Sequence, residues 1–345
     1  MSHLPFLVIN PDSTSNTAQD SAASAPSSAS PRSMSSQGAS TTSRALDFVR
    51  FPTVVVLALG ISAALYSVAA ELTGFELATV SRSLNEPWQI FGLVGWRIVE
   101  LYIFWVSGYD YWDVASLTLL TLIPYHSLLS LFYAISPVSV LSSIAIDLLS
   151  TVLPFALLRS SAPYNDPPSS APTSTQLSTS TGVKFIVTTY LAVAYAVTIF
   201  ACLQSFLPGY IISQFDIRTL EPVRAATLPI LLTAMLPVGN AVKSFLYVPS
   251  TFLAKATLEE KEFDPHSATL GETLAYNIGM SGWGKREDIL LRRSLLLAVL
   301  TVCASIAKIY GTVEGAELTG AIGWGSVWAA TGLFAGASLG YIGDA

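Results

Sequence analysis

Long apolar segments are the feature of this sequence that most limits its fold. A helix needs about 20 mainly apolar residues to cross the roughly 30 Å hydrocarbon core of a bilayer. Only 12% of the residues are charged, about half of what a soluble domain carries. The expected fold is an all-α bundle of about eight membrane-spanning helices, near residues 52–71, 87–107, 114–134, 138–158, 184–207, 226–247, 294–311 and 319–341.

Two of these spans are weaker than the others. The second contains Arg97 and Glu100, and the seventh is short and ends at Lys308. Charged residues are costly inside lipid, so a bundle of seven spans is the alternative.

Segments rich in Ser, Thr and Pro divide the chain. Such segments bury too little apolar surface to offset the entropy lost on ordering. They predict a disordered cytosolic tail over residues 1–45 and a flexible linker over 159–183. Spans one to four then occupy 46–158, and spans five to eight occupy 184–345, which includes a cytosolic loop at 248–293.

The distribution of Lys and Arg predicts the orientation. If the tail is cytosolic, eleven of these residues lie on the cytosolic side and four on the other. This bias places both termini in the cytosol, in an endomembrane such as that of the endoplasmic reticulum. A short amphipathic helix is expected before span seven, with Arg292 and Arg293 at the lipid headgroups.

Four ionisable residues fall near the centre of the bilayer. Arg97, Glu100, His126 and Asp147 each lie within roughly 5 Å of the expected midplane, taking about 1.5 Å of rise per residue. A charged residue at this depth costs about 2.5–3.5 kcal/mol on insertion scales. These residues therefore predict one polar site within spans two to four.

The chemistry expected of this site is acid/base catalysis. Arg97 and Glu100 share a helix face and neutralise each other. Asp147 has no basic neighbour on its own helix, so desolvation favours its neutral form. A neutral acid beside an ionised one forms an acid/base couple, and His126 could relay the proton.

Each of these residues also has a structural interpretation. Arg97 and Glu100 could join neighbouring spans, and Asp147 could serve packing. His126 could hydrogen-bond a carbonyl that Pro124 leaves free.

Two short patterns remain. Asp110 and Asp113 could hold magnesium against a diphosphate, although a solvated turn is the simpler interpretation. The glycines at 332, 336 and 340 lie on one helix face and allow close approach to a helix of the same chain or of a second copy.

Other chemistries lack their signatures. The chain has no P-loop, HExxH or GxSxG motif, and His3, His126 and His266 are too scattered to suggest a metal, so no cofactor or metal is expected. The net charge of −6 without a basic patch argues against nucleic acid as a partner. The expected partners are the lipid bilayer and a lipophilic small molecule; the oligomeric state is left open.

The acids and aromatics of spans two to four resemble those of fungal membrane-embedded terpene cyclases of meroterpenoid pathways. The likeness rests on Glu100, Asp147 and the deep rings of Trp96, Tyr102 and Tyr125. That family protonates an epoxide or olefin with an intramembrane acid. The resemblance implies a role in secondary metabolism, in which Asp147 protonates the substrate and Glu100 stabilises the cation.

The first hypothesis is therefore a membrane-embedded enzyme that uses intramembrane carboxylates on a lipophilic substrate such as a terpenoid. A proton-coupled or small-molecule transporter is the alternative, although the midplane charges lack counterparts in spans five to eight. A non-catalytic membrane scaffold is the third possibility.

Overall fold

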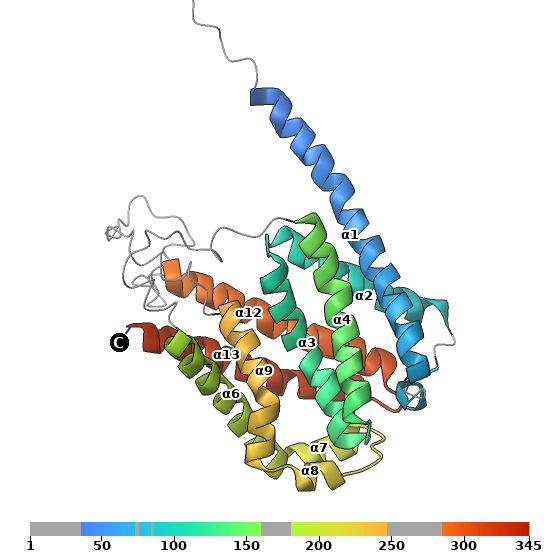
Figure 1. Ribbon diagram of the computed structural model, residues 1–345. Helices are drawn as coiled ribbons and strands as arrows, with labels where there is room; N and C mark the ends of the chain where they lie inside the picture. The colour runs from blue at the N-terminus through green and yellow to red at the C-terminus, as the bar shows by residue number, and fades with distance from the viewer. Residues whose placement is uncertain (1–35, 73–75, 84–85, 160–180, 247–284, 345) are drawn as a thin grey trace, which may run out of the picture. The chain divides into compact units, whose positions relative to one another are not determined.

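A computed structural model describes residues 36–72, 76–83, 86–159, 181–246 and 285–344 (Figure 1). The chain divides into two compact units, Met1–Leu46 and Asp47–Ala345, and the second contains most of the described helices. Most of the predicted tail, linker and cytosolic loop lies outside the described residues. Residues 36–45, assigned by the sequence to the tail, form the beginning of helix α1.

The fold is all-α, as predicted, and the described residues contain no strand beyond two isolated β-bridges. The predicted spans correspond to long helices. Most of their ends lie within a few residues of those expected, but α1 and α12 begin well before the predicted spans, at Ser36 and Lys285. The long elements are α1 (Ser36–Leu72), α2 (Pro87–Val106), α3 (Tyr111–Phe132), α4 (Pro137–Leu158), α6 (Thr181–Gln204), α9 (Leu228–Leu246), α12 (Lys285–Ser305) with its π-helical continuation η3 (Ile306–Tyr310), and α13 (Leu318–Asp344). The short elements, which the sequence did not indicate, are η1 (Glu76–Thr79), α7 (Leu207–Gln214) and α8 (Glu221–Ala225).

Seven of the described helices are long and apolar enough to cross a membrane, with mean hydropathy of 1.3 to 2.1. They include the two spans that the sequence marks as weak. The helix left out is α13, which is long enough but rich in Gly and Trp, residues that add little hydropathy. The short amphipathic helix expected before span seven is not separate, because residues 285–293 form the first turns of α12.

Local sequence explains where two central helices begin. Asp110 is the N-cap of α3 and accepts hydrogen bonds from the backbone N–H groups of Trp112 and Asp113 at 3.1 and 3.0 Å. Ser136 caps α4 in the same way, and Pro137 follows at the first helical position, where its missing N–H costs nothing.

Helix α3 forms the centre of the bundle and packs against α4, α9 and α12. Most of its membrane-spanning length is buried, whereas α1 and α2 are largely exposed. The central position of α3 brings residues of the first half of the chain against the second half.

Glycines allow the closest helix contacts. A methyl group on Gly239 of α9 would lie 2.7 Å from the backbone nitrogen of Ala192 in α6, so the two helices touch backbone to backbone. On α13, a methyl group at Gly336 would lie 2.9 Å from Cβ of Ser294 in α12, and Gly332 and Gly340 also face α12 side chains. The glycine face of α13 therefore serves packing within the chain, one of the two interpretations of its spacing.

Three loops meet at one end of the bundle. Isolated bridges pair Ser81 with Val313 and Phe215 with Ala316, and the backbone N–H of Arg218 donates to Phe132 O at 3.1 Å. This end lies at the C-terminus of α3 and the N-terminus of α4.

Candidate functional site

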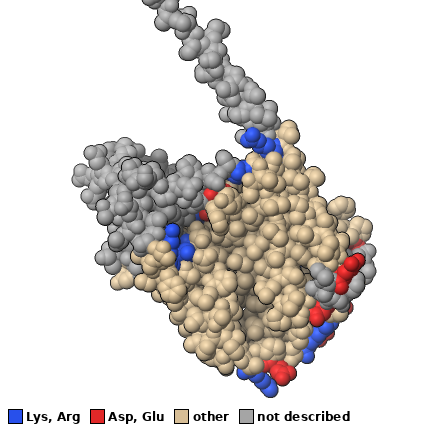
Figure 2. Space-filling view, in the orientation of Figure 1, with Lys and Arg blue, Asp and Glu red and all other residues tan. Residues whose placement is uncertain are grey.

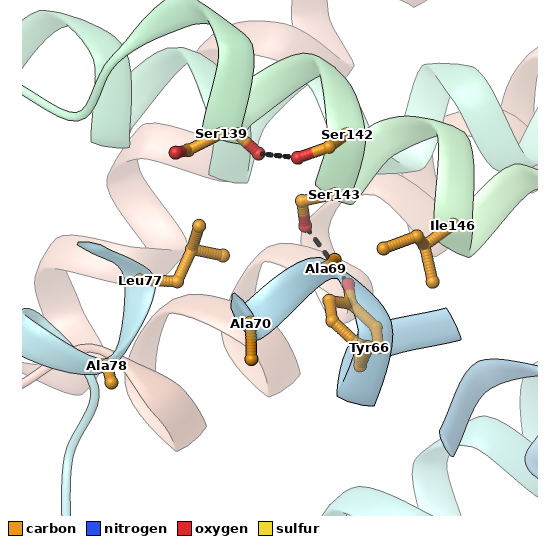
Figure 3. A pocket seen from close by; sticks show the side chains of 9 residues that line it. All are labelled: Tyr66, Ala69, Ala70, Leu77, Ala78, Ser139, Ser142, Ser143 and Ile146. Carbon is orange, nitrogen blue, oxygen red and sulfur yellow. Dashed lines mark hydrogen bonds between the residues drawn. The ribbon is translucent and has the colours of Figure 1, made fainter. Parts of the chain in front are cut away.

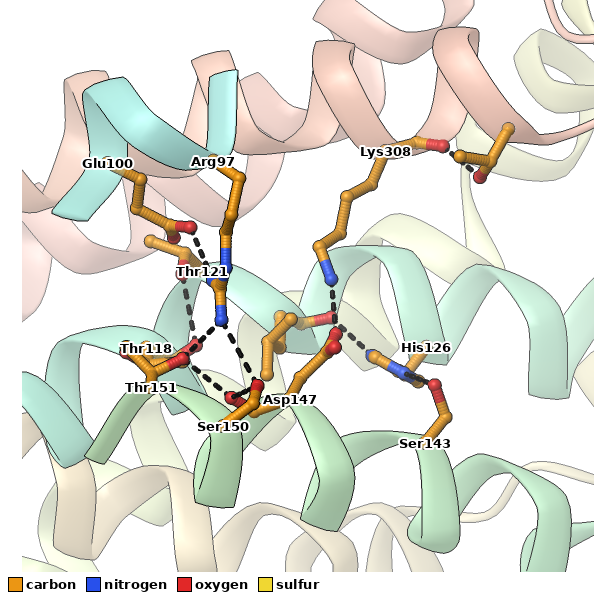
Figure 4. A network of polar contacts seen from close by, with 12 residues as sticks. Arg97, Glu100, Thr118, Thr121, His126, Ser143, Asp147, Ser150, Thr151 and Lys308 are labelled. Atoms are coloured by element: carbon orange, nitrogen blue, oxygen red, sulfur yellow. Dashed lines mark hydrogen bonds and ion pairs between the residues drawn. The ribbon is translucent and has the colours of Figure 1, made fainter. Parts of the chain in front are cut away.

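Asp147 of α4 is held by residues from two distant parts of the chain, and Figure 4 shows its contact with one of them, Lys308. The hydroxyl of Tyr66 in α1 donates to its Oδ1 at 2.9 Å, and the ammonium of Lys308 in η3 forms an ion pair with its Oδ2. The sequence places no basic neighbour on the helix of Asp147, and the structure agrees: the cation is Lys308, which lies 161 positions later, at the end of predicted span seven.

Arg97 and Glu100 form the ion pair that their spacing predicts, with 2.7 Å between Nη1 and Oε2. The other end of the Arg97 guanidinium donates to the hydroxyls of Ser150, at 3.4 Å, and Thr151 on α4. These two hydroxyls in turn donate to the backbone carbonyl of Asp147. The pair therefore joins α2 to α4, as its structural interpretation proposes.

His126 of α3 connects to the same network through Ser143 of α4. Its Nε2 lies 3.1 Å from Ser143 Oγ, which is itself 3.0 Å from the Tyr66 hydroxyl. Its Nδ1 lies 2.9 Å from Leu122 O, and this nitrogen carries a proton because a carbonyl can only accept. Pro124 leaves the carbonyl of Leu120 without its helical donor, so His126 does not serve the carbonyl that the sequence suggested.

The structure thus brings all four predicted residues into one network inside the bundle. Glu100 and Asp147 are buried, with 3% and 6% of their surfaces exposed. Two ion pairs make up its charged part. Breaking such a pair leaves an uncompensated charge in a medium of low polarity. The geometry therefore favours permanently paired charges over a carboxyl group held ready to donate a proton.

The cavity beside the network is small (Figure 3). Tyr66 and Ser143 line it together with Leu77, Ser139 and Ile146, and its volume is about 90 Å³. Sites for small ligands usually enclose about 300–1,000 Å³. This cavity is too small for a lipophilic substrate.

The deep aromatic rings do not enclose a shared pocket. Tyr125 lies with its ring 5.7 Å from Lys308 Nζ, but Tyr102 is 54% exposed and packs edge-on against Phe51. Trp96 is only partly buried, and its indole nitrogen has no hydrogen-bond partner among the described residues. Of the three deep rings that the sequence singled out, Tyr125 thus lies beside the network, through Lys308, and Tyr102 is directed to the exposed face of α2.

A second buried ion pair lies at the other end of α3. Arg293 of α12 contacts both carboxylate oxygens of Asp113, at 3.3 and 3.4 Å, and donates to Phe245 O at 2.7 Å. Its guanidinium also lies over the rings of Tyr109 and Phe245. Burial raises the pKa of the Tyr109 hydroxyl, and the charge of Arg293 partly offsets this effect.

This pair corrects two predictions from the sequence. Asp110 and Asp113 form neither a solvated turn nor a free acidic pair, since one caps α3 and the other binds Arg293. Arg293 does not extend to the headgroups, whereas Arg292 is exposed and pairs with Asp288 at 3.0 Å. Among the residues that the structure describes, no group of three or more His, Cys, Asp or Glu side chains could hold a metal ion.

Comparison with known proteins supplies one match. Residues 180–342 match the family model described as the bouquet formation protein 3 C-terminal domain. The match covers a little under half of the chain, from α6 to α13, and includes Arg293 and Lys308 but none of the four predicted site residues. No curated protein and no solved structure matches the chain.

This match overturns the functional prediction. The sequence led us to expect an enzyme acting on a lipophilic substrate, whereas the matching family is named for bouquet formation. The match does not support that enzyme and gives the transporter alternative no better support.

Proposed function

We propose that this chain is a non-enzymatic integral membrane protein that takes part in meiotic bouquet formation, the gathering of telomeres. The observation that carries the proposal is the match of residues 180–342 to the C-terminal domain of bouquet formation protein 3. The seven long apolar helices agree with a role performed within a membrane.

In this proposal the buried charges hold the helices together and do no chemistry. Asp147 and Asp113 belong to the first half of the chain, outside the matching segment, and their partners Lys308 and Arg293 lie inside it. Two buried ion pairs thus fasten the first half to the matching domain. Buried charges that find a defined partner also restrict how helices can pack.

We further propose that α13 crosses the membrane as an eighth span, so that both termini face the cytosolic side of an endomembrane, such as that of the endoplasmic reticulum. The excess of Lys and Arg in the tail, the linker and the segment that precedes α12 supports this orientation. The opposite side would then hold the loops around η1, α7 and α8.

The test is telomere position in meiotic cells of the source organism that lack the protein. We expect telomeres to remain dispersed in most prophase nuclei, and expression of the full-length chain to restore their clustering. A tagged full-length copy should fractionate with membranes and resist extraction by carbonate. Normal clustering in the deletion strain would refute the proposal.

A further inference from the structure

A cleft of about 400 Å³ opens between α4 and α9. Val140 and Ile144 of α4 line one wall, Ile230 and Ala234 of α9 line the other, and α3 supplies much of the floor. Both walls pack against α3 but make few contacts with each other. Figure 2, which has the orientation of Figure 1, shows the surface hollowed between these helices.

The size and position of the cleft limit what can fill it. Its walls belong to helices that qualify as membrane spans, so its open side faces lipid. The volume lies within the range of about 300–1,000 Å³ that is usual for small ligands. A spanning helix about 10 Å wide and roughly 30 Å long occupies about 2,000 Å³ and does not fit.

The lining is mostly apolar, and no Lys, Arg, Asp or Glu contributes to it. Ser130 is partly exposed, and its hydroxyl makes no hydrogen bond to any described residue. The indole nitrogen of Trp328 also lacks a partner in the described part of the chain, but it has almost no accessible surface and is out of reach of an occupant of the cleft. A ligand with an acceptor oxygen near Ser130 suits this lining.

A positive charge lies beside the mouth of the cleft. Ser130 is two residues from the end of α3, and Pro222 and Ala225 of α8 line the cleft at this end. Arg224 lies between these two residues in sequence, but its side chain lines the neighbouring hollow formed with residues 217–221 and not the cleft itself. It is exposed and pairs with no described residue. Its neighbours are Glu221 on the same short helix and Arg218, whose guanidinium donates to the hydroxyl and the carbonyl of Thr79.

We infer that this cleft binds a membrane phospholipid, with one acyl chain between α4 and α9 and the phosphate at Arg224. An ester oxygen of the lipid supplies the acceptor that the Ser130 hydroxyl lacks. A sterol offers a hydroxyl to Ser130 but leaves Arg224 without an anion. The inference is independent of the proposed role in bouquet formation.

The first experiment uses the full-length protein in nanodiscs of phosphatidylcholine that carries a photoreactive diazirine on one acyl chain. We expect mass spectrometry to find crosslinks concentrated on α4 and α9 peptides that line the cleft. Ala234→Phe fills the cleft and should lower this labelling about tenfold, a loss of ~1.4 kcal/mol in binding. Leu153→Phe, at an exposed position of α4 outside the lining, should leave it unchanged.

The second arm tests the headgroup. Arg224→Gln should lower cleft labelling by the phospholipid probe about tenfold while the melting temperature stays that of the wild type. A photoreactive sterol should label the cleft no more than other lipid-facing helices. Uniform phospholipid labelling, wild-type labelling of Ala234→Phe, or preferential labelling of the cleft by the sterol would each overturn the inference.

Discussion

Asp147 receives a hydrogen bond from Tyr66 and an ion pair from Lys308, which lie on opposite sides of it in the sequence. Arg97 likewise binds Glu100 and two hydroxyls of α4. At the scale of single residues, each charge near the bilayer centre is thus neutralised by a neighbour. This pairing explains how such residues can remain in the membrane-spanning helices.

Replacing one partner of the Asp147–Lys308 pair should destabilise the folded protein more than replacing both. We expect Asp147→Asn to destabilise the protein by up to about 3–5 kcal/mol, because Lys308, which is partly buried, is left without its partner. The double variant Asp147→Asn with Lys308→Gln should recover a large part of this loss. Unfolding in mild detergent, followed by the loss of tryptophan fluorescence, measures each variant.

The control for this cycle is the exposed pair of Arg292 and Asp288, since Arg292→Gln should change stability by less than about 1 kcal/mol. A double variant as unstable as the sum of the two singles would show that the ion pair does not act as a unit.

Glu76 should give stability a pH dependence. Hydrogen bonds from Ser136 and Ser139 lower the pKa of its carboxyl from an ordinary 4.5. The pKa of Glu76 is lower in the folded protein than in the unfolded chain, so its ionised carboxylate stabilises the fold fully at a pH above the unfolded-state pKa. This stabilisation is lost as the pH falls through the lower, folded-state pKa. The melting temperatures of wild type and Glu76→Gln should differ at pH 7 and converge at low pH. A difference that persists in acid would contradict this role.

At the scale of helices, apolar length predicts most of the fold because a bilayer permits few alternatives to the spanning helix. The beginning of α2 at Pro87 and of α4 at Pro137 lie where the sequence placed them. The short helices α7 and α8 were missed, since neither has the length or periodicity that distinguishes a helix from a loop. The candidate site was found as a group because its residues are rare in apolar segments.

The partners of that site could not be predicted from sequence. Lys308 lies at the end of a weak span, and only the packing of the two halves of the chain shows that it reaches Asp147. Arg293 is similar, because a basic residue beside a span is usually an anchor at the headgroups. Pairing across the chain depends on tertiary contacts, which a single sequence does not contain.

The contact of α6 with α9 should depend on Gly239. We expect Gly239→Ala to destabilise the protein by about 1–3 kcal/mol, since the added methyl group would collide with the backbone of α6. Gly95→Ala on α2 is the matched control, because that position has open space around it and alanine favours the helix. Equal stabilities of the two variants would contradict the close contact.

At the scale of the whole molecule, the matching segment forms about half of the bundle and receives two acids from the other half. Arg293 pairs with Asp113, and Lys308 pairs with Asp147. The two pairs lie at opposite ends of the region where α3 and α4 contact the second half of the chain. We therefore expect the second half expressed alone to be poorly folded, with two cations left unpaired. Co-expression with residues 46–159 should raise its yield in the membrane fraction, whereas equal yields would contradict this dependence.

The central claim is that the protein supports bouquet formation without using its intramembrane acids in a reaction. The most direct measurement is the fraction of meiotic prophase nuclei with clustered telomeres in a deletion strain that expresses the Asp147→Asn, Lys308→Gln double variant at the wild-type level. We predict clustering close to that given by the wild-type chain. Failure of this folded variant to restore clustering, together with accumulation of a lipophilic precursor, would contradict the claim.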